Sequence, residues 1–80
     1  QDYLAEFAKD KIIKKEGEKI KKTELLETFK QWYTAHYGRG VPVGREVYEF
    51  MDKRYGRYRQ GWHNVAIVYD DDEDDVLDEC

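Results

Sequence analysis

The chain has 80 residues, of which 14 are Lys or Arg, 18 are Asp or Glu and 40% are hydrophobic, which is enough for one small domain with one core. It contains neither the roughly 18 to 20 consecutive apolar residues of a membrane-spanning helix nor a signal-peptide pattern, so we expect an intracellular protein outside the membrane. Its single cysteine, Cys80, excludes an internal disulfide. Because the chain begins with Gln1 and not Met, we expect it to be a piece of a longer protein.

The positive and negative charges are unevenly distributed along the chain. Residues 1–69 carry 14 basic and 10 acidic side chains, a net charge of +4, whereas residues 70–80 carry eight acidic and no basic side chains. An uninterrupted acidic block repels itself and has little surface to bury. We therefore expect a folded domain over residues 1–69 and a flexible acidic tail over residues 70–80.

The first two predicted elements are a helix and a short strand. Apolar residues at helical spacing predict an amphipathic helix over residues 2–15, which Gly17 would end. The alternation at residues 19–21 is long enough only for a minimal strand, in which Ile20 would point inward.

Two further helices are predicted after this strand. Thr23 is positioned to cap a second helix that ends at Gly38. After a loop that contains Pro42, a third helical pattern ends at Gly56. The aromatic residues expected to anchor the core are Phe29, Trp32, Phe50 and Trp62.

The last predicted element is a β-hairpin. Residues 57–59 would form its first strand, Gln60 and Gly61 its turn, and residues 62–69 its second strand, in which apolar and polar residues alternate. This order of elements predicts an α+β fold, a small winged helix-turn-helix with three helices, a short β-strand and a C-terminal β-hairpin wing. A generic small α+β domain is the alternative.

Most of the predicted domain resembles the C-terminal domain of viral and phage primase-helicases, which include the poxvirus-type nucleoside triphosphatases. The residues that carry the resemblance are 7–17, 19–25, 29–33 and 61–67, with an aromatic-Lys-x-Trp-aromatic run at 29–33 and a Gly-Trp-x-x-Val run at 61–65. The resemblance implies a winged helix that follows a superfamily-3 helicase motor and serves DNA replication in the cytoplasm of a bacterial host or a virus-infected cell. Val43 and Gly44 stand where relatives often have a Ser or Thr cap, and the acidic tail is not part of the family pattern.

The sequence does not offer a nucleophile and a base that could act together in catalysis. It contains no Ser, its Cys is terminal, and His36 and His63 lie in different predicted elements, so a nucleophile and its base cannot be assembled. Residues 38–40 lack the length and the Lys-Ser/Thr pair of a phosphate loop. The acidic tail lacks the glycine and the final Glu of a calcium loop. We therefore expect a domain with no enzymatic activity, cofactor or metal ion, whose histidines have structural roles.

Basic and aromatic residues are interleaved around the predicted hairpin, a pattern typical of phosphate contacts. The predicted nucleic-acid-binding residues are Arg45, Lys53, Arg54, Arg57, Tyr58 and Arg59. Arg57 and Arg59 would share one face of a strand. The third helix is expected to expose a mixed set of charges, namely Arg45, Glu46, Glu49, Asp52 and Lys53. A second basic cluster, which can contact DNA backbone, act as a nuclear signal or do neither, consists of Lys14, Lys15, Lys19, Lys21 and Lys22.

Two functions remain open from the sequence. The first is an accessory DNA-binding domain of a replication primase-helicase, monomeric in isolation, which makes weak contacts to the DNA backbone without sequence preference. The second is a protein-interaction domain that recruits or regulates another replication protein and does not bind DNA. The acidic tail would either compete with nucleic acid for the wing or act only as a solubilising extension. The tail residues assigned to this regulation are Asp70, Asp71, Asp72, Glu73, Asp74 and Asp75.

Overall fold

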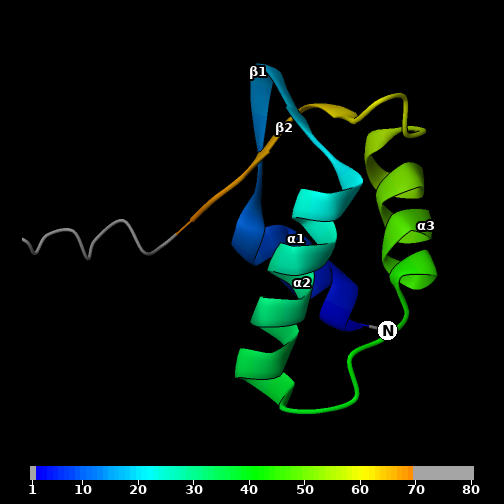
Figure 1. Ribbon diagram of the computed structural model, residues 1–80. Coiled ribbons are helices and arrows are strands. Elements are labelled where there is room, and N and C mark those ends of the chain that lie inside the picture. The colour runs from blue at the N-terminus through cyan, green and yellow to red at the C-terminus, as the bar shows by residue number, and fades with distance from the viewer. Residues whose placement is uncertain (1, 70–80) are drawn as a thin grey trace, which may run out of the picture.

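The computed structural model describes residues 2–69. Its elements are, in chain order, α1 (Asp2–Lys11), β1 (Ile12–Ile20), α2 (Lys22–Tyr37), α3 (Gly44–Tyr55) and β2 (Trp62–Ile67). They form a small α+β fold in which β1 and β2 pair as a two-stranded antiparallel sheet. In Figure 1 the two strands lie above α1 and α2, and α3 stands beside them.

The first helix is shorter than predicted. It ends at Lys11, and the chain continues directly as β1, so the prediction of helix to residue 15 was wrong. The cause is pairing across the sheet, because Ile12 lies opposite Ile67 of β2 and Ile13 lies opposite Ala66. Isoleucine is β-branched and suits a strand, and this long-range pairing decides a segment whose local pattern also fits a helix.

Gly17 does not end a helix, as predicted, but lies inside β1. The register of the two strands shifts between Lys14 and Lys19, and Gly17 in this interval has a φ of +87°. Its backbone N–H donates to the side-chain oxygen Oδ1 of Asn64 on β2 at 3.1 Å, and Asn64 itself has a φ of +63°. Glycine and asparagine are the residues that most readily adopt this conformation. The bend of β1 in Figure 1 therefore corresponds to an irregularity in strand pairing, which the Asn64 side chain stabilises by accepting the Gly17 N–H.

The second and third helices are confirmed by the structure, including their C-terminal ends. Gly38 and Gly56 have φ values of +86° and +101°, and each donates its backbone N–H to the carbonyl four residues earlier. The predicted cap at Thr23 was wrong, since the N-cap position of α2 is Lys21 and has no side-chain hydrogen bond.

The predicted hairpin is not formed, and the prediction of its first strand at residues 57–59 was wrong. Residues 57–61 are not part of a strand, and the partner of β2 is β1. The Arg59 backbone N–H instead donates to the Gly61 carbonyl at 3.0 Å, which turns the chain tightly just before β2. The expected shared strand face of Arg57 and Arg59 therefore does not exist. β2 ends at Ile67 and not at residue 69.

The core is small and aromatic. Phe29, Trp32 and Trp62 are buried as predicted, and Ile20 points inward. Phe50 was wrongly predicted as a core anchor, because it is only half-buried at the edge of the core. The residues of α3 that face the core are Val47 and Met51, which are fully buried one helical turn apart.

Carboxylates that accept hydrogen bonds from aromatic side chains connect the elements around this core. Three such links join pairs of secondary-structure elements, with donors and acceptors Tyr3 and Glu46 (2.7 Å, α1 to α3), Trp32 and Asp10 (3.0 Å, α2 to α1) and Trp62 and Asp52 (2.9 Å, β2 to α3). A buried indole N–H needs such an acceptor, and a charged acceptor gives the stronger hydrogen bond. These links orient each helix relative to its neighbours.

We expect the two tryptophans to dominate the stability of the domain. Trp32→Ala or Trp62→Ala should lower the free energy of unfolding by about 3 to 5 kcal/mol, which is enough to unfold a domain of this size. Phe50→Ala should cost clearly less, because that ring is half-buried. Chemical denaturation of the three variants checks this order, and an unchanged midpoint for Trp62→Ala would contradict the core described above.

The contact between α1 and α3 should be visible in a tyrosine titration. The hydrogen bond to Glu46 and, to a smaller extent, burial and the charge of Glu46 raise the pKa of Tyr3 from 10.0 to about 12. Because the folded state then holds this proton more tightly than the unfolded state, the contribution of Tyr3 to stability is complete below pH 10 and is lost as the pH rises through 12.

Phenolate absorbance of the folded protein measures this directly. Tyr3→Phe should remove the contribution of one tyrosine to the absorbance change near pH 12. Glu46→Ala should move that contribution toward pH 10, since both the acceptor and the charge are gone. An unchanged amplitude near pH 12 in Tyr3→Phe would show that Tyr3 does not ionise there.

Candidate nucleic-acid interface

The residues predicted to bind nucleic acid lie at both ends of α3 and in the connection that follows it. Arg45 is in the first turn of α3, whereas Lys53 and Arg54 are in its last turn, about 12 Å further along the helix axis. Arg57 and Arg59 lie in the α3–β2 connection, which we define as residues 56–61. The five cations are exposed, but the length of α3 separates Arg45 from the others.

Tyr58 fixes the α3–β2 connection to the rest of the fold. Its ring packs edge-on against Trp62, with 4.7 Å between the ring centroids. Its backbone N–H donates to Oδ1 of Asp52 at 3.1 Å. Tyr58 also contacts Lys22. The Nζ atom of Lys22 lies 4.8 Å from the centroid of the Tyr58 ring, and the Lys22 backbone N–H donates to the Tyr58 hydroxyl at 3.4 Å. Tyr58 is thus half-buried and brings the start of α2 against the connection.

Lys19 reaches the same region from β1. It pairs with His63 across the sheet, and its side chain lies over Gly61, where an added Cβ atom would be only 2.9 Å from the Lys19 Cδ atom. Gly61 therefore leaves the space that this lysine occupies. From the sequence, Lys19 and Lys22 were predicted to belong to a basic cluster separate from the arginines near Tyr58. The local signal that a side chain packs closely here is Gly61, which lies next to the start of β2.

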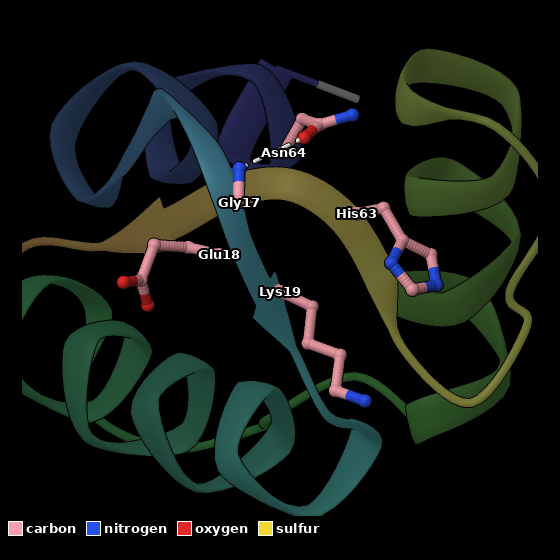
Figure 2. A pocket seen from close by; sticks show the side chains of 5 residues that line it. All are labelled: Gly17, Glu18, Lys19, His63 and Asn64. Atoms are coloured by element: carbon pink, nitrogen blue, oxygen red, sulfur yellow. Dashed lines mark hydrogen bonds between the residues drawn. The ribbon is translucent and has the colours of Figure 1, made fainter.

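His63 joins two adjoining hollows on this side of the molecule. One is lined by Arg59, Gln60 and His63, and the other includes Lys19 and His63. Figure 2 shows Lys19 and His63 extending to the same side of β1, while Glu18 projects to the other side. The Nε2 atom of His63 is 2.8 Å from the Arg59 carbonyl oxygen.

These contacts gather cationic side chains from distant parts of the sequence. We use the name basic face for the set Lys19, Lys22, Arg57, Arg59 and His63. Within residues 2–69, no ion pair joins its lysines or arginines to a carboxylate, so their charges face solvent. Such a surface attracts anions. Its residues come from β1, α2, the α3–β2 connection and β2.

Two of the three acids of α3 accept hydrogen bonds from other parts of the fold, and all three keep their negative charge. Asp52 was predicted to be exposed, but it is half-buried and accepts hydrogen bonds from Trp62 and from the Tyr58 backbone. Glu46 accepts from the Tyr3 hydroxyl. Glu49 remains exposed and shares a hollow with Lys53, on the side of α3 that faces α1.

The other candidate residues lie away from the basic face or outside the described part. Lys14 is paired with Val65 beyond the bend of β1. The exposed ring of His36 stacks on Trp32 with 4.6 Å between the centroids, and its Nδ1 atom is 2.9 Å from the Trp32 carbonyl oxygen. The acidic tail, Asp70 to Asp75 included, lies outside the described residues.

Residues 2–69 contain neither a candidate metal site nor a candidate membrane-spanning helix. No three His, Cys, Asp or Glu side chains in this range are grouped so that they can hold a metal ion. In the same range, no helix has the length and the apolar character needed to cross a membrane.

Comparison of the chain with protein-family models, with curated proteins and with solved structures found no match. Its function therefore has to be argued from the basic face and the fold that positions it.

Proposed function

We propose that this domain binds the phosphate backbone of nucleic acid through the basic face, weakly and without sequence preference. The observation that carries the proposal is the meeting of two basic segments around Tyr58 and Gly61, with Lys22 over the tyrosine ring and Lys19 over the glycine. Lysine and arginine contacts to phosphates do not depend on the base sequence. Lys19, Lys22, Arg57 and Arg59 are exposed and have no carboxylate partner among residues 2–69, which suits this mode of binding.

The arrangement favours backbone contacts over contacts to bases. The ring of Tyr58 is packed against Trp62 and is also covered by the Lys22 ammonium group, which lies 5.0 Å from the Tyr48 centroid as well. Neither ring is then free to stack on an unpaired base. We therefore expect duplex DNA, which has the higher charge density, to bind at least as tightly as a single strand of equal length.

The proposed function includes a finer description of the fold. The order α1, β1, α2, α3, β2 supports a winged helix-turn-helix in which α3 occupies the position of the recognition helix. The α3–β2 connection would take the place of the wing, although no outer strand forms there. The residue pattern quoted above further supports a role as an accessory domain of a viral or phage replication primase-helicase.

A protein-interaction domain is the second candidate. It is favoured by the hollow between α1 and α3, in which half-buried Leu4 and Phe50 are flanked by Glu49 and Lys53. An apolar floor with a charged rim is the usual composition of a protein contact. This hollow lies between α1 and α3, whereas the basic face is formed by residues of β1, α2, the α3–β2 connection and β2. Variants in one surface therefore leave the residues of the other surface in place.

Titration with a duplex of mixed sequence tests the proposal. The dissociation constant should be roughly 10⁻⁴ to 10⁻⁶ M, and a plot of log K against log salt should have a slope of about −3 to −4, as three or four phosphate contacts give. Replacing Arg57 and Arg59 together by Gln should reduce the slope by about 2.

The matched control removes the same charge elsewhere. Lys30 and Arg39 are exposed, the first in the middle of α2 and the second in the loop after it, and neither belongs to the basic face. Their replacement by Gln should leave the slope nearly unchanged. An equal loss in both double variants would show that only net charge matters. No complex at high micromolar protein and low salt would make the protein-interaction domain the leading candidate.

The acidic tail is expected to weaken this binding. β2 separates the basic face from Tyr69 by six residues, about 20 Å, which an 11-residue tail can span when extended. A chain that ends after Tyr69 should bind duplex more tightly at low salt, and a detached tail peptide should compete with DNA. The difference should vanish near 0.5 M salt, where charges are screened within a few ångströms. Equal affinities with and without the tail at low salt would show that it does not compete.

A further inference from the structure

We infer that Lys19, Arg59 and His63 form a subsite for one phosphate group, and that protonation of His63 controls how tightly this subsite binds. The inference rests on the proposed function, because it assigns one phosphate of the nucleic-acid backbone to a place on the basic face. It adds a dependence on pH that arginine and lysine contacts alone do not have.

The first step is the tautomer of His63. Its Nε2 atom lies 2.8 Å from the Arg59 carbonyl oxygen, which can only accept a hydrogen bond. Nε2 must therefore carry the proton and donate it. In the neutral ring the remaining nitrogen, Nδ1, then presents a lone pair, and only the protonated ring presents an N–H there.

The second step is the surroundings of the ring. From β1, Lys19 is the cross-strand partner of His63 and lines the same hollow. Glu18 also lines this hollow, and its side chain extends to the opposite side of β1 from Lys19 (Figure 2). From the α3–β2 connection, Arg59 and Gln60 line the adjoining hollow. From α3, Asp52 is engaged with Trp62 and the Tyr58 backbone.

A phosphate oxygen placed among Lys19, Arg59 and His63 would meet a lone pair at Nδ1 when the ring is neutral. When the ring is protonated, the same oxygen would accept a charge-assisted hydrogen bond. Phosphate binding and protonation of His63 therefore favour each other, as linked equilibria must. Affinity should therefore be higher when the ring is protonated than when it is neutral.

The test measures binding of a mixed-sequence duplex at pH 6 and pH 8 at constant ionic strength. Phosphodiesters stay singly charged over this interval, so a change comes from the protein. Wild-type affinity should fall by about three- to tenfold at the higher pH, as expected for one partly exposed ionic contact. His63→Gln, whose amide can still donate to the Arg59 carbonyl, should bind equally at pH 6 and pH 8.

The chain provides a matched control in its only other histidine. His36→Gln removes an exposed imidazole that stacks on Trp32 and faces Asp10, and it should keep the wild-type dependence on pH. Thermal unfolding of both variants checks that each is folded. NMR resonances of the two rings at pH 6 give an independent readout, in which DNA should shift the signals of His63 and not those of His36.

The possible results separate this inference from the proposed function. If wild type binds duplex equally at pH 6 and pH 8, or if His63→Gln keeps the dependence, the subsite is wrong while backbone binding stands. If no variant binds duplex at either pH, the proposed function fails as well. Inorganic phosphate provides the last comparison, since shifts of His63 with phosphate but none with duplex would assign the subsite to a small anion and overturn the assignment to nucleic acid.

Discussion

The carboxylate of Asp52 holds together the three segments on which the basic face depends. Its Oδ1 atom accepts hydrogen bonds from the indole N–H of Trp62 at 2.9 Å and from the backbone N–H of Tyr58 at 3.1 Å. One oxygen thereby fixes the end of α3, the α3–β2 connection and the start of β2 relative to one another. Truncation of Asp52 would leave the indole N–H of buried Trp62 and the backbone N–H of half-buried Tyr58 unpaired, which is costlier than the loss of an exposed ion pair.

The same use of carboxylates recurs elsewhere in the fold. Acidic residues on the helices accept hydrogen bonds from tyrosine and tryptophan, as Glu46 does from Tyr3 and Asp10 from Trp32. They are thereby directed toward neighbouring elements, whereas lysine and arginine keep their charged ends in water. The excess of negative charge belongs to residues 70–80, so the charge of the described part has the opposite sign from that of the whole chain.

The backbone near the basic face is also shaped by residues with unusual conformations. Asn64 accepts the N–H of Gly17 where β1 bends, and the neighbouring His63 pairs with Lys19 immediately beyond that bend. Gly61 then leaves room for the lysine side chain. The position of Lys19 beside His63 thus depends on a strand irregularity that brings the two strands back into register.

Local patterns in the sequence determined the second and third helices, since apolar spacing and a terminal glycine are properties of a single segment. They also determined the burial of Trp32 and Trp62 and the division of charge at residue 69. Only the tertiary structure decided that the chain becomes a strand at Ile12, because Ile12 gains its partner, Ile67, far along the sequence. The same holds for residues 57–59, which alternate like a strand but pair with no other strand, and for the approach of Lys19 to His63 and Gly61. Strand pairing and side-chain proximity depend on contacts between distant segments, which periodicity within one segment does not encode.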